Sequence, residues 1–261
     1  MIRTSIAQAA RSLAPPLTFF LLVLAIWHGT VELLDIQPFL LPGPGRVIDA
    51  VANNLPGLMR AARLTAMGAL GGFLLALVCG FTIAVLFSQS RIIERSLYPY
   101  AIFLQTVPIV AIAPLIVIWI GHGIYGVVAV SFIISLFPIV VNTATGLTAI
   151  PVELLELFAL NGASRWQTLI KLRIPNAVPS FLTGAKISCG LSVIGAIVGE
   201  FFAGYGSEDF GLGYLIMLTK AQTKIAYLFA TILFSTGLGL AFFGAVSGLN
   251  RLILTRWNGN R

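Results

Sequence analysis

Residues 152–175 read VELLELFALNGASRWQTLIKLRIP, a polar and partly basic stretch between two strongly apolar parts of the chain. Over the whole chain, 58% of the 261 residues are hydrophobic and 10% are charged, with a mean hydropathy of +0.97. In a soluble domain about a quarter of the residues are charged, so this composition predicts an integral membrane protein. Such a protein has no packing reason to carry so long a polar stretch between two spans. We therefore expect a partner protein to bind it.

The apolar residues are gathered in six runs that carry no charge or almost none. Each run is long enough to cross a hydrocarbon core of about 30 Å. The runs are continuous rather than alternating, which favours helices over a barrel, because a helix satisfies its own backbone groups in lipid. The sequence predicts an all-α, polytopic membrane protein with a single transmembrane domain over residues 1–261. The six predicted helices cover Leu13–Val31, Leu64–Phe87, Tyr98–Ile120, Gly123–Ile150, Val178–Phe202 and Ile225–Leu249.

The distribution of basic residues predicts the orientation of the chain. With the N-terminus inside, all but five of the 16 lysines and arginines fall on the cytoplasmic side. Lys186 is one of these cytoplasmic residues. This agrees with the positive-inside rule, and both termini and the loop 151–175 are then cytoplasmic. The net charge of +7 follows from orientation and attraction to anionic lipid, so it requires no nucleic acid. The five outer residues are Arg46, Arg60, Arg63, Lys220 and Lys224.

Within the polar stretch, the spacing of five residues is specific. Gly162 lies six residues after Glu156, and Leu172, Ile174 and Pro175 end the stretch. This spacing resembles the EAA loop of permease subunits in binding-protein-dependent ABC importers, written as E-A-A, three residues, G, nine residues, I, one residue, L-P. Glu156, Gly162 and Pro175 match the motif outright, while Leu172 and Ile174 are aliphatic exchanges.

The resemblance implies how this loop works. The segment from Glu156 to Arg165 would form a short coupling helix that lies along the membrane surface and docks into a groove of a cytoplasmic ABC ATPase dimer. Leu157 and Phe158 replace the two alanines of the motif, so the docking surface is bulkier. We expect Gly162 to supply either a positive φ or room for a close approach between two short helices. The expected coupling residues are Glu156, Leu157, Phe158, Gly162, Ala163, Arg165 and Pro175.

Three further stretches resemble the branch of these permeases that transports nitrate, sulfonates, taurine, bicarbonate and thiamine-precursor pyrimidines. They are TVPIVAIAPLIVIWIGHG at 106–123, FPIVVNTATGL at 137–147 and VGEFFAGYGSEDFGLGYLI at 198–216. The resemblance implies a permease with the MetI-like ABC permease fold in the inner cell membrane. It also implies a small polar solute and a periplasmic or lipid-anchored substrate-binding protein. ATP and Mg²⁺ would bind to the ATPase, and no cofactor would bind to this chain.

The number of coupling loops predicts the oligomeric state. An ATPase dimer that closes around two ATP sites needs two coupling elements, whereas this chain has one EAA-like loop. Symmetric pairing is also the commonest oligomer geometry. We expect a homodimer whose two-fold axis is normal to the membrane, with a different permease paralogue as the alternative second copy.

Polar residues inside the predicted helices are candidates for the translocation pathway. Gln105 and Thr106 stand beside Pro108 and Pro114, which would both kink the third predicted helix. The alternative is that the prolines only curve this helix around its neighbours. Asn142, near the inner end of the fourth predicted helix, either faces the pathway or hydrogen-bonds another helix.

Glu200 is the only acidic residue within a predicted span. An ionisable group in a membrane is costly unless it reaches water or a partner, which makes it a functional candidate. We predict that Glu200 faces the pathway near the outer gate. Because it lies close to the outer end of its span, the alternative is that it reaches water or pairs with an outer base such as Lys220.

Two other classes of function fit the sequence less well. A secondary transporter driven by an ion gradient predicts inverted repeats and several intramembrane charges at broken helices, but this chain has one such carboxylate and no visible repeat. An intramembrane enzyme requires clustered ligands, whereas the two His and two Cys are far apart in the sequence, so we predict neither a metal site nor a catalytic residue. The chain has no G-x-x-x-x-G-K-[ST] phosphate loop, so a partner must hydrolyse the ATP.

Overall fold

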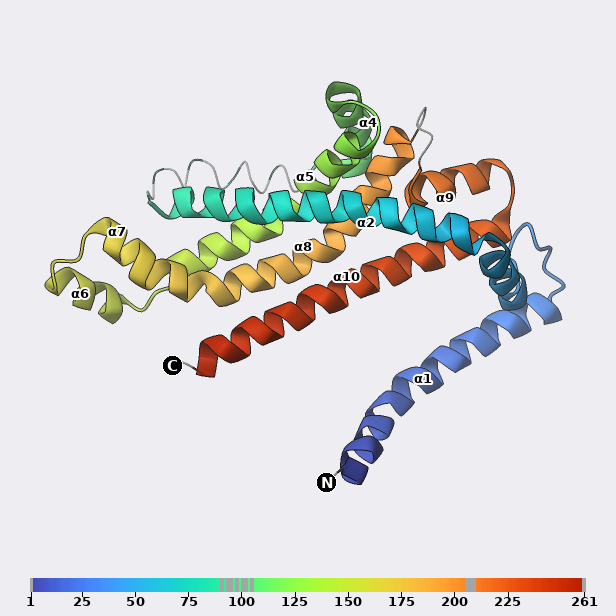
Figure 1. The fold of residues 1–261 in the computed structure, drawn as a ribbon, viewed down its shortest axis with the longest axis horizontal. Coiled ribbons are helices and arrows are strands. Elements are labelled where there is room, and N and C mark those ends of the chain that lie inside the picture. Colours follow the sequence, from blue (N-terminus) through green and yellow to red (C-terminus); the bar gives the residue numbers. More distant parts are fainter. Residues whose placement is uncertain are drawn as a thin grey trace. The chain divides into compact units, whose positions relative to one another are not determined.

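The computed structural model of the chain describes residues 2–89, 92, 96, 99, 103, 106–204 and 210–259, with side chains between residues 14 and 257 (Figure 1). Within these ranges the regular structure is entirely helical, which confirms the predicted all-α class. Five stretches are long and apolar enough to cross a membrane. Four of them lie in α1 (Ile2–Leu33), α2 (Pro44–Gln89), α5 (Ile124–Thr148) and α10 (Ile225–Gly259). The fifth is the continuous run formed by α7 (Arg165–Thr168), the π-helix η1 (Leu169–Arg173) and α8 (Ile174–Ala203).

The third predicted helix differs from the prediction. Helix α4 (Ile109–Ile120) begins only after Pro108, whose φ of −66° and ψ of 106° are extended. Only Pro114 lies inside the helix, so the expectation that both prolines kink one helix is wrong. Proline lacks an N–H and disfavours helical backbone in the residue before it, here Val107, so Pro108 marks a helix start instead.

The described chain forms two compact units. One comprises Met1–Leu58 and Ile216–Leu233, and the other comprises Met59–Leu215 and Phe234–Arg261. Helices α2, α9 and α10 each contribute residues to both units. The second unit contains every described residue that the sequence nominated for coupling or for the pathway, so the following sections concern this unit.

Helices α5 and α8 form the core of the second unit and run side by side (Figure 1). Ser131 Oγ donates a hydrogen bond to the carbonyl of Ser192 over 2.9 Å. Further along, Ser188 Oγ donates one to the carbonyl of Ser135 over 2.6 Å. Small residues permit this approach, since a Cβ at Gly195 would lie 2.7 Å from Ser131 Cα. The two helices that flank the polar stretch therefore form one closely packed pair.

Candidate functional site

The polar stretch folds into two short helices joined by a tight turn. Helix α6 (Val152–Leu160) follows α5, and α7 continues through η1 into α8. Figure 1 shows α6 and α7 beyond the ends of α5 and α8. No residue of α6 is buried. We call residues 152–168 the coupling element, after the role that the sequence predicts for them.

The turn between α6 and α7 is a Schellman motif centred on Gly162. Its φ of +66° lies in the left-handed region, so the structure has the positive φ, one of the two reasons expected for this glycine. The Gly162 N–H donates to the carbonyl of Ala159 over 3.0 Å. The Ala163 N–H donates to the carbonyl of Phe158, also over 3.0 Å. These bonds satisfy carbonyls that the end of a helix leaves unpaired. The space around Gly162 is open, so backbone conformation rather than a clash opposes a side chain there.

A capping box begins α7. The Gln167 N–H donates to Ser164 Oγ over 3.2 Å, and the Ser164 N–H donates to Gln167 Oε1 over 2.8 Å. The two side chains satisfy backbone donors at the start of the helix. Both residues are absent from the sequence-based candidates, although S-R-W-Q at 164–167 fits the S/T-x-x-E/Q signature of such a cap.

The coupling element presents apolar side chains next to charged ones. Leu157 is 52% exposed and Trp166 is 70% exposed. Exposed apolar residues beside polar ones are typical of an interaction surface. Six of the seven predicted coupling residues lie in this element, and Pro175 follows it in α8. The exposed ones are Glu156, Leu157, Gly162 and Arg165, and the half-buried ones are Phe158, Ala163 and Pro175.

Between the coupling element and α8 the helix widens for one turn. In η1, the Ile174 N–H donates to the carbonyl of Leu169, five residues back. Pro175 follows directly. Proline has no N–H, and its ring collides with the carbonyl four residues before it, so a wider turn accommodates it. Pro175 therefore influences how α7 joins α8, although it lies outside the coupling element.

Glu200 lies near the end of α8 and is only 4% exposed. Thr65 Oγ1 on α2 donates a hydrogen bond to Glu200 Oε2 over 2.9 Å, and the Gly213 N–H donates to the same oxygen over 2.8 Å. The Leu212 N–H donates to Thr65 Oγ1 over 2.9 Å. Leu212 and Gly213 begin helix α9 (Leu212–Ala221), so side chains from α8 and α2 cap its first turn. A carboxylate suits the positive end of a helix dipole.

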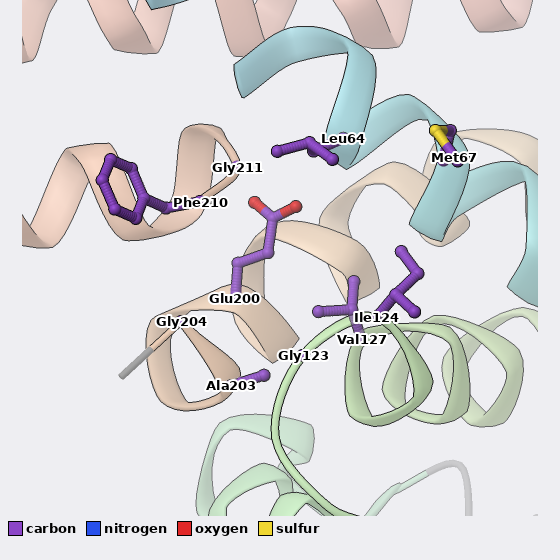
Figure 2. A pocket seen from close by; sticks show the side chains of 10 residues that line it. All are labelled: Leu64, Met67, Gly123, Ile124, Val127, Glu200, Ala203, Gly204, Phe210 and Gly211. Atoms are coloured by element: carbon purple, nitrogen blue, oxygen red, sulfur yellow. The ribbon is translucent and has the colours of Figure 1, made fainter. Parts of the chain in front are cut away.

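A cavity of about 320 Å³ borders this carboxylate. Figure 2 shows the Glu200 carboxyl group between Gly211 and Leu64, with Phe210 beside them. Gly211 lies so close to the carboxyl group that a Cβ would collide with it. Among the lining residues labelled in Figure 2, Glu200 alone has an ionisable side chain. The site therefore combines an apolar cavity with one acidic group.

The other pathway candidates make local hydrogen bonds. Thr106, which is exposed, donates from Oγ1 to the carbonyl of Phe103 over 2.7 Å. Asn142, which is half-buried, donates from Nδ2 to the carbonyl of Pro138 over 2.7 Å. Gln105 lies outside the described residues. No hydrogen bond described in the structure joins Thr106 or Asn142 to Glu200, and their role in a pathway stays a prediction.

Lys186 is a charged residue of α8 that the sequence did not nominate for the site. It lies twelve residues after Ile174 and so about 18 Å along the helix axis. Its Nζ lies 5.1 Å from the centroid of the Phe243 ring, a cation–π contact with α10. Its placement on the cytoplasmic side stays a prediction. Lys186 also falls within the predicted span Val178–Phe202, and an ionisable residue within a span is a functional candidate.

Together, the membrane-crossing helices, the exposed coupling element and the buried carboxylate define a polytopic membrane transport subunit. The chain belongs to the family described as "Binding-protein-dependent transport system inner membrane component", whose model matches residues 72–255. It is thus a permease subunit of an ABC importer, as the EAA-like spacing predicted. This membership overturns the alternative of a secondary transporter driven by an ion gradient.

Named relatives and a solved structure agree with the family. The formylaminopyrimidine transport permease protein ThiX of Halalkalibacterium halodurans is 34% identical over 240 residues, covering 92% of this chain and 94% of that protein. The riboflavin transport system permease protein RibX of Chloroflexus aurantiacus is 34% identical over 250 residues, covering 94% and 90%. A permease chain of the inward-facing MetNI methionine ABC transporter superposes with a TM-score of 0.63 at 19% identity, covering 75% and 95%. The last match supports the fold.

The cap on α9 leads to a prediction for Thr65. Replacing Thr65 by Val removes a donor to Glu200 and the acceptor of the Leu212 N–H, and leaving such buried groups unpaired costs about 1–3 kcal/mol. We expect faster amide hydrogen exchange at residues 212–215 in Thr65→Val. Thr82→Val on the same helix is the control, because Thr82 Oγ1 bonds only its own helix, to the carbonyl of Val78. Equal exchange in the two variants would contradict the cap.

Proposed function

We propose that this permease couples ATP hydrolysis by a separate cytoplasmic ABC ATPase dimer to the passage of a small polar solute. The observation that supports this most strongly is the coupling element, which is exposed and contains the spacing of Glu156 and Gly162 that resembles an EAA loop. Its turn and its capping box satisfy backbone groups with local partners. An element that keeps its shape by local bonds is suited to carry motion from one protein to another.

The side chains of the coupling element fit a docking role. Leu157 and Trp166 offer exposed apolar surface on either side of the Gly162 turn, and Arg165 adds a positive charge. Glu156 is exposed and can accept hydrogen bonds from basic or backbone donors of the ATPase. Charge-assisted bonds of this kind are worth about 1.5–3 kcal/mol. The groove that receives this element would therefore be apolar, with basic or backbone donors facing Glu156 and an acidic group facing Arg165.

Closure of the ATPase dimer around ATP and Mg²⁺ then draws two coupling elements together. The helices attached to them turn the pathway toward the outer side, where a periplasmic or lipid-anchored binding protein delivers the solute. Hydrolysis returns the inward-facing state. In this scheme the permease itself binds no nucleotide or other cofactor. Membrane lipid surrounds it.

The solute is proposed from the relatives. Two of them are named for formylaminopyrimidine and for riboflavin, both polar heterocycles. The wider branch that the sequence resembles carries nitrate, sulfonates, taurine and bicarbonate. We propose a small polar solute of the pyrimidine type or of the nitrate, sulfonate and taurine type. Assays should therefore begin with a formylaminopyrimidine, riboflavin and taurine.

The orientation and the second subunit are part of the proposal. The excess of basic residues on one side supports cytoplasmic termini and a cytoplasmic coupling element. One coupling element per chain supports a homodimer with a two-fold axis normal to the membrane.

The homodimer leads to a prediction about mass. Native mass determination of the complex purified with its ATPase should give two copies of this chain for every two ATPase subunits. Differentially tagged copies of the chain should also purify together. A complex with one copy of this chain and one copy of a paralogue would contradict the homodimer.

Glu200 is proposed to face the translocation pathway near the outer gate. The cavity beside its carboxyl group supports this placement. We expect Glu200→Gln to alter uptake of the transported solute, because it removes the charge, while the complex still assembles. Uptake by proteoliposomes and co-purification with the ATPase measure the two effects. Normal transport by Glu200→Leu would rule out a role in gating.

Gly162 gives the sharpest test of coupling. Valine at a left-handed position costs about 1–2 kcal/mol in the turn alone and more for a β-branched side chain, so Gly162→Val should displace α6 relative to α7. We expect this variant to insert into the membrane but to lose ATPase association or stimulated hydrolysis. Gly162→Asn is the matched control, because asparagine tolerates positive φ, and it should retain most of the association.

Two results would contradict this assignment. One is normal uptake by Gly162→Val. The other is labelling of the coupling element from the periplasmic face by a membrane-impermeant reagent.

A further inference from the structure

Two side chains at the junction between the coupling element and α8 bind two other helices. Arg173 Nη1 donates a hydrogen bond to the carbonyl of Ser88 over 3.1 Å. Asn176 Nδ2 donates to the carbonyl of Gly146 over 3.0 Å and to that of Ala149 over 2.9 Å. Ser88 is in α2, and the other two carbonyls are at the end of α5.

The bonds of Asn176 satisfy groups that α5 cannot satisfy itself. The last four carbonyls of a helix have no partner within it, and they are the negative end of its dipole. The guanidinium of Arg173 brings a charged donor to a carbonyl of α2, and such a bond is stronger than one between neutral groups. The amide of Asn176 supplies two N–H donors, and the structure pairs both with carbonyls of α5.

An apolar cluster lies at the same junction. Leu169 of η1 is 2% exposed and packs with Ala84 of α2 and with Ala144 and Leu147 of α5. Ala177 of α8 completes the buried cluster. Closely packed protein interiors transmit strain, so a displacement of one residue is passed on to its neighbours. The turn that follows the coupling element is therefore fixed to α2 and α5 by packing as well as by hydrogen bonds.

We propose that Arg173 and Asn176 are positioning residues that divide the motion of the coupling element between two helices, Arg173 to α2 and Asn176 to α5. This inference rests on the proposed function, because it presumes that the coupling element moves when the ATPase closes. Neither residue belongs to the EAA-like spacing: Arg173 occupies an unspecified position of the motif and Asn176 follows its end. Their role is to carry motion onward, whereas the coupling element binds the ATPase.

Spin labels on three helices test this division. Single cysteines at exposed positions Glu153 in α6, Leu86 in α2 and Thr145 in α5, in a chain whose Cys79 and Cys189 are replaced by alanine, each give one distance between the two copies. The distances are compared in the complex with its ATPase, without nucleotide and with Mg·ATP plus vanadate. In the parent chain we expect all three distances to change.

The variants should separate the three labels. In Arg173→Gln the change at Leu86 should fall to less than half, while the changes at Glu153 and Thr145 persist. Asn176→Asp keeps the shape but replaces the donors by a negative charge, so it should suppress the change at Thr145 and spare that at Leu86. Arg173→Lys keeps a cationic donor and should restore the change at Leu86. Arg251→Gln, which removes an exposed arginine from α10, should alter none of them.

Other results would contradict the inference or the proposed function. If both variants keep all three changes, or if they weaken all three equally as a general loss of stability would, the inference is overturned. If the parent chain shows no change at Glu153, the proposed coupling function itself fails, and this inference fails with it.

Discussion

An unpaired backbone N–H or carbonyl is costly in hydrocarbon, and the arrangement of this permease follows from that constraint. Inside a span the helix satisfies its own backbone, but every helix end leaves groups that need another partner. The chain supplies these partners from different sources. The turn at Gly162 and the box of Ser164 and Gln167 are local, whereas Thr65 and Glu200 reach α9 from other helices.

This difference between local and distant caps corresponds to the proposed division of labour. The coupling element is capped by its own residues, so it can dock on another protein as a unit. Helix α2 and the end of α5 are bound by Arg173 and Asn176, which belong to the segment that the coupling element would move. At the other end of α8, Glu200 ties the start of α9 to α2 and α8. Helix α8 thus connects the coupling element to the cavity beside Glu200.

Glu200 and Lys186 are charged residues of α8 that differ in burial and in their partners. Burial alone does not define the role of either residue. Glu200 is buried and accepts two hydrogen bonds, which offsets the cost of removing a carboxylate from water. Lys186 is exposed on the helix, and its ammonium group lies over the ring of Phe243. Wherever the membrane covers this part of α8, a cation cannot face hydrocarbon without a large cost. The helix face that carries Lys186 is therefore a second place to look for contact with water or with another subunit.

The sequence by itself determined the features that depend on local pattern. Run length and composition predicted the membrane helices, and the spacing of Glu156, Gly162 and Pro175 predicted the family and the need for a glycine at position 162, because these depend on neighbours along the chain. Only the tertiary structure decided that Pro108 precedes α4 and that Glu200 meets Thr65 and Gly213. It also paired Arg173 with the carbonyl of Ser88 in α2. Such contacts join residues far apart in the sequence, and no local pattern specifies which helix end a side chain will reach.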